Sequence, residues 1–243
     1  MKEKLKLLLR YFYRYKFGGI LLFIRIYWLN AAEVNVPGVG KVKIRPGTTD
    51  AAIFTQIFIY ATYDFPVSGE VNTILDLGGN NGMSARFFRA RYPKAKIVVV
   101  EPDETNFAAL CKNIEGYDQI IPLKMAVWKE DGFIRLDNGD SWAIKVDMDG
   151  GHKVAEAITM KTLLAKQGIS RIDLLKIDIE SAEKEVFEAE ASFLAITRNM
   201  VVELHDWIKP GCAAAFFNTL VGYTYIYTIQ GENTLLRDLN RAS

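Results

Sequence analysis

The stretch "ILDLGGNNG", residues 74–82, decides the fold. A short apolar run that carries one acid, Asp76, ends directly in a turn that begins with Gly78 and Gly79. In open α/β sheets, ligands bind outside the carboxyl ends of the strands, where turns of this kind lie. The stretch therefore predicts a buried strand whose following turn passes close to a small ligand.

Around this stretch the chain alternates between expected strands and expected helices. Strands are expected at 73–78, 96–102, 120–128, 172–180 and 199–207, and helices at 81–93, 104–117, 159–169, 181–195 and 211–222. This alternation predicts a doubly wound α/β fold with a mostly parallel sheet. Residues 132–147 interrupt it as an inserted antiparallel hairpin, with strands at 133–137 and 142–146 and a turn at Asn138-Gly139. A second, edge hairpin is expected over 223–239.

Residues 1–50 form an expected N-terminal extension of basic, apolar helices and a short β segment, and residues 51–243 form the main domain. Within the extension, residues 1–32 interleave lysine and arginine with leucine, phenylalanine and tyrosine. Their longest uncharged run is far shorter than the ~20 residues that span a bilayer. One interpretation is an amphipathic helix in peripheral contact with the inner membrane surface. The alternative, which we favour, is that these helices pack on the main domain.

The composition is ordinary for a globular protein. The net charge of +1 gives no reason to expect nucleic acid as a partner. The two cysteines, Cys111 and Cys212, lie in expected helices and predict no disulfide framework. A cytoplasmic location fits this composition best.

The spacing of the turn residues discriminates between ligands. A dinucleotide site has the pattern G-x-G-x-x-G, and a Walker site has Gly-Lys-Ser/Thr, but neither is present here. Instead Asp76 precedes Gly78 and Gly82, so a carboxylate can accept a hydrogen bond from a ligand ammonium group while two residues without Cβ let the backbone approach it. This arrangement favours S-adenosylmethionine over NAD.

The second expected strand ends in Glu101, followed by Pro102. An acid in this place can accept both hydroxyl groups of a ribose, and the proline turns the chain away so that the carboxylate faces the crevice. NAD enzymes share this feature, so Glu101 indicates a nucleoside without saying which one.

Candidate catalytic residues lie at the ends of the fourth and fifth expected strands, "KIDIE" and "VELHD". There Lys176, Asp178 and Glu180 share one side of a strand, as Glu203 and His205 do on the next. His205 is the proposed base for a hydroxyl proton, with Glu180 beside it. A divalent metal held by Asp178, Glu180 and His205 is an alternative, although no close spacing of ligands supports it.

Five motifs in this order resemble the FkbM family of S-adenosylmethionine-dependent methyltransferases: "ILDLGGNNGMSARFF", "VVVEPDETNFAALCKNI", "MAVWKEDGFIRL", "LLKIDIESAEKEVF" and "MVVELHD". The resemblance implies the seven-stranded Rossmann-like methyltransferase sheet and transfer to oxygen, often on a sugar or polyketide. The family usually has glycine where this chain has Ser181. We expect Ser181 to act as the N-cap of the following helix.

The sequence thus predicts an O-methyltransferase that acts on a hydroxyl group of a sugar, glycan, or lipid-linked or secondary-metabolite acceptor. The alternatives are an NAD-dependent oxidoreductase and a non-catalytic, membrane-associated nucleoside-binding module. His205 and Glu180 are the expected catalytic residues. The expected cofactor-binding residues are Asp76, Gly78, Gly79, Asn80, Gly82, Glu101, Pro102, Ala126 and Asp178.

Overall fold

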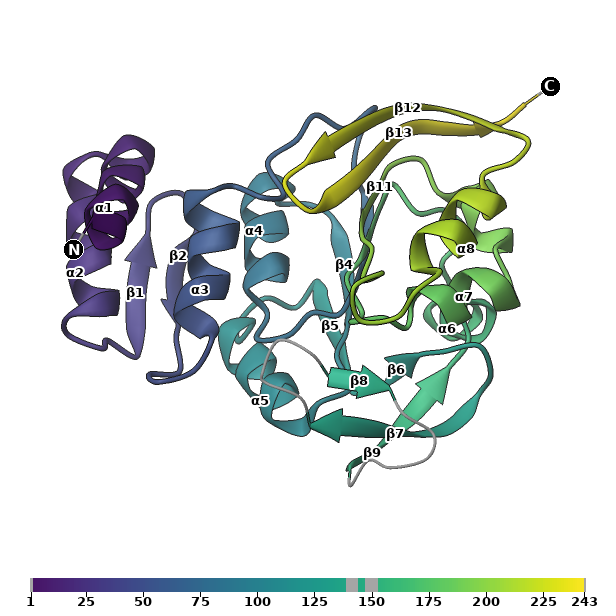
Figure 1. Cartoon of the computed structure of the whole chain (residues 1–243), viewed down its shortest axis with the longest axis horizontal. Helices are drawn as coiled ribbons and strands as arrows, with labels where there is room; N and C mark the ends of the chain where they lie inside the picture. The colour runs from purple at the N-terminus through teal and green to yellow at the C-terminus, as the bar shows by residue number, and fades with distance from the viewer. Residues whose placement is uncertain (1, 139–143, 147–152, 243) are drawn as a thin grey trace.

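The computed structural model describes residues 2–138, 144–146 and 153–242. Its centre is a seven-stranded sheet with the strand order β12-β13-β11-β10-β3-β4-β5 (Figure 1). The five strands from β11 to β5 run parallel, and β13 lies antiparallel between β11 and β12. The doubly wound, mostly parallel sheet predicted from the sequence is therefore confirmed. The strands are β3 (Thr73–Leu77), β4 (Lys96–Val100), β5 (Ile120–Leu123), β10 (Leu174–Ile177), β11 (Met200–Glu203), β12 (Tyr223–Gln230) and β13 (Asn233–Arg241).

Helices cover both faces of this sheet, because the side chains of each strand alternate between two buried clusters. Ile74 joins a cluster that contains Phe88 of α4, whereas its neighbour Leu75 joins a cluster that contains Phe187 of α7. Two-sided burial leaves only the carboxyl ends of the parallel strands open for a ligand. The helices are α4 (Met83–Arg91) and α5 (Glu104–Asn113) on one face, and α6 (Met160–Gln167), α7 (Glu183–Ala189) and α8 (Cys212–Thr219) on the other.

The expected strand at 120–128 is in fact two strands in two sheets. After β5 the chain leaves the large sheet, and β6 (Ala126–Val127) pairs with β9 (Lys153–Ile158) in a four-stranded sheet of order β6-β9-β7-β8. The expected hairpin is present as β7 (Gly132–Asn138) and β8 (Ile144–Val146). The sequence did not predict β9, "KVAEAI", in which alanine, lysine and glutamate are residues with little strand preference. Trp142 and His152 lie outside the described residues.

The N-terminal extension packs on the main domain through a shared hydrophobic cluster. Tyr11 of α1 is fully buried, and its hydroxyl lies 2.9 Å from Thr55 Oγ1. The main domain begins with a short α-helix that is continued by a π-helical segment, which η1 denotes. The elements are α1 (Lys2–Tyr15), α2 (Phe17–Tyr27), β1 (Glu33–Val36), β2 (Gly40–Lys43), α3 (Asp50–Phe54) and η1 (Thr55–Ile59).

Among the described residues, no helix has the length and apolar character that crossing a membrane requires. The division of the chain at residue 50 stays a prediction.

Candidate functional site

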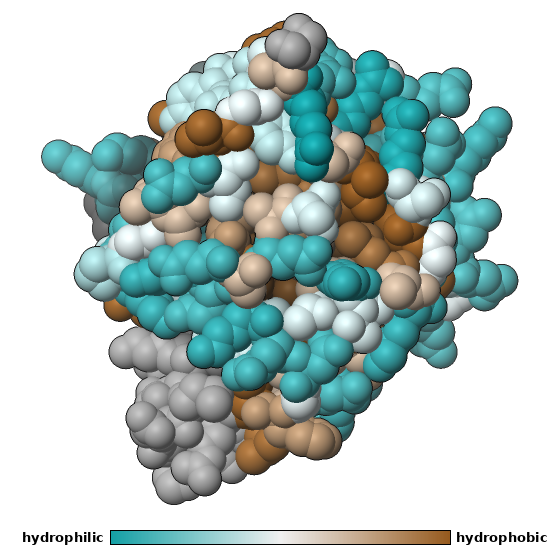
Figure 2. All heavy atoms as spheres, turned by 90° about the vertical axis from the view of Figure 1, so that its right-hand side faces the viewer, coloured by the Kyte–Doolittle hydropathy of each residue, from teal (hydrophilic) through white to brown (hydrophobic). Residues whose placement is uncertain are grey.

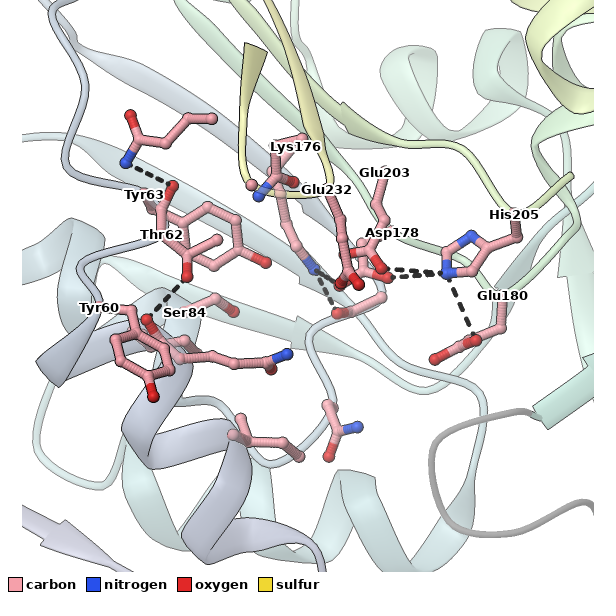
Figure 3. Close-up of a pocket in the computed structure, with 18 of the residues that line it drawn as sticks. Tyr60, Thr62, Tyr63, Ser84, Lys176, Asp178, Glu180, Glu203, His205 and Glu232 are labelled. Carbon is pink, nitrogen blue, oxygen red and sulfur yellow. Dashed lines mark hydrogen bonds and ion pairs between the residues drawn. The ribbon is translucent and has the colours of Figure 1, made fainter. Parts of the chain in front are cut away.

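A cavity of about 1010 Å³ opens at the carboxyl ends of β3, β10 and β11. The glycine turn lines this cavity together with charged side chains from the end of β10 and β11 and from the residues that follow them, of which Lys176, Asp178, Glu180, Glu203 and His205 are labelled in Figure 3. Tyr60 and Tyr63 lie beside the turn, in the segment after η1. The cavity lining includes Gly78, Gly79, Asn80, Asn81, Ser84, Lys176, Asp178, Glu180, Glu203, His205 and Glu232.

The glycines of the turn are required by packing within the protein. A Cβ on Gly78 would lie 1.7 Å from the Asp178 carbonyl oxygen, and one on Gly79 would lie 2.1 Å from Val99 Cγ1. Gly78 also has a φ of +81°, which residues with a Cβ rarely adopt. We expected the missing Cβ of Gly78 and Gly82 to let the backbone approach a ligand, but in the structure the residue after β10 approaches Gly78 and Leu110 of α5 approaches Gly82. Gly78 and Gly79 line the cavity, whereas Gly82 does not.

Asp76 lies behind the cavity wall rather than in it. The carboxylate is fully buried, accepts a hydrogen bond of 2.6 Å from Ser84 Oγ, and lies 3.2 Å from Lys176 Nζ. Lys176 in turn donates a 2.5 Å hydrogen bond to the carbonyl of Gly78. Burial lowers the pKa of Lys176, but the charges and hydrogen bonding of Asp76, Tyr63 and Asp178 together raise it more, so the net pKa is raised and the ammonium is retained. Asp76 therefore fixes a buried cation against the turn, and its contact with a cofactor stays a prediction.

Glu101 is also buried, and it holds the turn from the other side. Its carboxylate accepts backbone hydrogen bonds from Asn80 at 2.8 Å and from Asp103 at 2.9 Å. Burial raises the pKa of Glu101 to about 7. Glu101, Pro102 and Ala126 do not line the cavity, so their contacts with the cofactor also stay predictions.

Asn80 provides a test of whether the turn suits a polar ligand. Its backbone has a φ of +45°, and it lines the cavity. Its side-chain oxygen is buried and has no hydrogen-bond partner among the described residues. A buried amide oxygen without a partner is costly unless a ligand or water donates to it. The turn thus fits a ligand with hydrogen-bond donors, such as the nucleoside and amino-acid parts of S-adenosylmethionine.

His205 is the centre of a cluster of carboxylates at the ends of β10 and β11. Since β10 and β11 are neighbours in register, with Ile177 opposite Val202, the residues that follow them meet at the cavity. His205 Nε2 lies 3.5 Å from Glu180 Oε2, 3.6 Å from Glu203 Oε1 and 3.7 Å from Asp178 Oδ1 (Figure 3). The sequence prediction therefore placed these groups together correctly.

The sequence prediction did not include Glu183 among the site residues, and it placed Lys176 in the cluster without assigning it a role. His205 Nδ1 pairs at 2.9 Å with Glu183 Oε1, and Glu183 is fully buried in the first turn of α7. Lys176 lies 3.5 Å from Asp178 Oδ2. The stretch "KIDIESAE" could have indicated both Lys176 and Glu183, because the end of a strand and the first turn of the following helix lie at the same corner of the fold.

The charged groups around His205 shift one another's pKa values. Burial and the charge of Asp178 raise the pKa of Glu180 and of Glu203 to about 8 each. Burial lowers the pKa of His205, but the hydrogen bond and charge of Glu183 outweigh it and raise the pKa to about 9. Several acids that share one buried corner stabilise a cation among them.

Glu180 and Ser181 have an unusual backbone. Their φ values are +53° and +82°, a left-handed conformation that favours glycine. The N-cap of α7 is Ala182, and no side chain caps the helix, so the expectation that Ser181 is the N-cap is wrong. The left-handed pair turns the chain sharply after β10 and places the Glu180 side chain in the cavity. Strain of this kind concentrates at functional sites.

The comparison with known families agrees with this geometry. The family model described as "Methyltransferase FkbM domain" matches residues 76–225, more than half of the chain. The chain belongs to the FkbM methyltransferase family. The protein is accordingly an S-adenosylmethionine-dependent methyltransferase.

Individual relatives of this methyltransferase are distant. The "2-O-methyltransferase NoeI" of Sinorhizobium fredii is 27% identical over 183 residues, which cover 67% of this chain and 73% of the relative. "Methyltransferase 1" of Beauveria bassiana is 26% identical over 181 residues, 63% of this chain and 73% of the relative. Among solved structures, M. capricolum TrmK in complex with S-adenosyl-homocysteine has a TM-score of 0.41 at 10% identity, over 75% of this chain and 68% of that chain.

Proposed function

We propose that this methyltransferase transfers the methyl group to a hydroxyl oxygen of a sugar, a glycan, or a lipid-linked or secondary-metabolite acceptor. The observation that carries the proposal is the corner around His205, where a buried imidazole faces carboxylates in the cavity that the glycine turn also lines. A hydroxyl group is a poor nucleophile until its proton is removed, and such a corner provides groups that can take the proton.

The printed names of relatives support the acceptor class. NoeI is named as a 2-O-methyltransferase. AglP of Haloferax volcanii, 26% identical over 58% of this chain and 59% of its own length, is named as a hexuronic acid methyltransferase. These names favour an oxygen acceptor on a carbohydrate-like molecule over the NAD-dependent alternative.

The proposed methyl transfer requires that the chain bind the cofactor and that it take a proton from the acceptor. Bound S-adenosylmethionine supplies a methyl group on a sulfonium. The glycine turn, Asn80 and Glu101 hold this cofactor, with Asp178 at the junction with the acceptor. Transfer of this methyl group to the acceptor oxygen would release the O–H proton, and the corner of Glu180 and His205 would take that proton.

The test separates cofactor binding from methyl transfer. His205→Asn should lower kcat by about 100-fold, a typical contribution of a group that activates a proton transfer. The Kd for S-adenosylmethionine, measured by calorimetry, should stay within about threefold, because the polar contacts of His205 are with the carboxylates around it and not with the described residues of the turn. A variant that loses cofactor affinity and turnover equally would instead make His205 a structural residue.

We propose further that residues 1–32 contact the inner membrane surface peripherally, which would keep the protein cytoplasmic. Residues 2–28 carry seven basic side chains and one acid, Glu3, in a chain of net charge +1. Large apolar side chains recur four residues apart on each helix and are exposed: Leu5, Leu9 and Tyr13 on α1, and Phe17 and Leu21 on α2. Cations beside exposed apolar and aromatic side chains fit an anionic lipid surface, whereas pairing two copies would bring like charges together.

This helix pair also lies next to the cavity. Arg10 and Tyr60 line both the cavity and a groove of about 760 Å³ along α1. The opposite end of the molecule is covered mostly by hydrophilic side chains (Figure 2). A membrane-bound acceptor would therefore approach the cavity from the α1 side.

Sedimentation with vesicles tests the membrane contact. Wild-type protein should sediment with vesicles that contain anionic phosphatidylserine and less with pure phosphatidylcholine. Leu9→Ser/Phe17→Ser/Leu21→Ser should abolish sedimentation, whereas Val221→Ser, at an apolar residue exposed elsewhere, should not. Equal behaviour of the two variants, or no sedimentation of the wild type, would remove this part of the proposal.

A further inference from the structure

We propose that Asp178, Glu203 and His205 form a binding site for one divalent cation of the Mn²⁺ type. One ligand atom from each residue lies within 4.8 Å of the other two. Two ligands 2.0–2.2 Å from one metal, at angles of 90–110°, lie about 3 to 3.5 Å apart. The distances of 3.6 and 3.7 Å from His205 Nε2 to the two carboxylates are close to this geometry without any ion.

The orientation of His205 is the independent observation. The side chain is 2% exposed, and its Nδ1 faces the fully buried Glu183, whose Oε1 also accepts the Ile179 amide hydrogen. With Nδ1–H donating to Glu183, Nε2 is the ring nitrogen that faces the carboxylates, and a cation that displaces its proton would gain its lone pair. No hydrogen bond reaches Nε2 from any described residue, and its neighbours are carboxylate oxygens, which are acceptors as well. A buried carboxylate that fixes the outer nitrogen of a histidine is the usual partner of a metal-bound imidazole.

The charges around the site favour an added cation. The two carboxylate oxygens of Asp178 face different partners: Oδ2 lies 3.5 Å from Lys176 Nζ, and Oδ1 faces His205. Lys176 is shared with the fully buried Asp76, so it does not balance Glu180, Glu183 and Glu203 as well. Carboxylates crowded at low solvent exposure are costly unless a cation lies among them.

The donor set indicates the class of cation. Two carboxylate oxygens and one imidazole nitrogen suit Mn²⁺ and neighbouring divalent metals better than Ca²⁺, which takes oxygen ligands almost alone. The three ligands lie at the cavity wall, so further coordination positions face the acceptor space.

The inference rests on the proposed function in one respect: a cation here would bind the acceptor oxygen and make its proton easier to remove. His205 would then act as a ligand. Glu180, outside the ligand set and 3.5 Å from His205 Nε2, would take the proton.

Calorimetric titration with Mn²⁺ alone tests the site without any methyl transfer. The wild type should bind one Mn²⁺ per chain. Glu203→Gln and the positioning variant Glu183→Gln should each weaken binding by about 10- to 100-fold. Glu232→Gln, at another carboxylate of the same cavity, is the matched control and should leave the Kd within about threefold.

No Mn²⁺ binding by the wild type at millimolar concentration would overturn the inference, as would equal weakening in Glu232→Gln and Glu203→Gln. Circular dichroism checks that each variant is folded. A separate titration with S-adenosylmethionine tests the proposed function, so the cation and the methyl transfer can fail independently.

Discussion

The protonation state of Glu101 should make cofactor affinity depend on pH. The predicted contact of Glu101 with two ribose hydroxyls needs the ionised carboxylate, yet burial raises its pKa to about 7. Because the folded-state pKa is raised, the stability contribution of the neutral form is present at low pH and is lost as the pH rises through about 7. Cofactor affinity should change in the opposite direction, since it needs the ionised form.

S-adenosyl-homocysteine should therefore bind about tenfold more weakly at pH 6 than at pH 8, in proportion to the ionised fraction of Glu101. Titration calorimetry across this range measures the effect. Glu101→Gln should bind weakly with little dependence on pH. An affinity of the wild type that is flat from pH 6 to pH 8 would show that Glu101 is not the group that accepts the ribose.

Ser181 carries a local cost that a glycine would remove. Its φ of +82° disfavours a side chain by about 1 kcal/mol. Ser181→Gly should therefore raise the free energy of unfolding by about 0.5–1 kcal/mol in urea denaturation. Ala182→Gly, next to it at a φ of −77°, should lower stability instead. A loss of stability in Ser181→Gly would contradict the assignment of strain to this residue.

At the scale of elements, the turn after β3 is locked between β4 and β10. A Cβ on Gly79 would meet Val99 Cγ1 at 2.1 Å, so Gly79→Ala should cost about 1–3 kcal/mol of stability. Val99→Ala removes the clashing methyl group and, alone, costs the usual amount for truncating a core side chain. The double variant should lose less than the sum of the two losses. Additive losses in urea denaturation would exclude this contact as the reason for glycine.

The elements that the sequence predicted best are those with strong local signals. The parallel strands and their helices follow from apolar runs and from caps such as Thr159, the first residue of the expected helix at 159–169, whose side chain caps α6. The break between β5 and β6 and the position of β9 depend on pairing with distant strands, for which the sequence carries no local pattern.

The contrast between local sequence patterns and contacts with distant segments also applies to the candidate site. Strand ends bring Asp178, Glu203 and His205 together because the sheet order fixes them. The contacts of Glu183 and Lys176 could not be predicted in this way. Their burial and their partners depend on how α7 and β10 pack in three dimensions, which the local sequence does not determine.

At the scale of the whole molecule, cofactor binding should stabilise the fold by mass action. At 100 times its Kd, S-adenosyl-homocysteine should add about 2.7 kcal/mol to the free energy of unfolding. For a chain of this size that corresponds to a rise in Tm of about 5–10 °C, measurable by scanning calorimetry. NAD at the same concentration should leave Tm unchanged.

The most direct test of the central claim is calorimetric titration of the wild type with S-adenosyl-homocysteine, alongside Glu101→Gln. We predict one binding site per chain in the wild type and a clear loss of affinity in the variant. Absence of binding to the wild type at millimolar concentration, or affinity for NAD in its place, would contradict the account of the turn at residues 78–82 as the cofactor site.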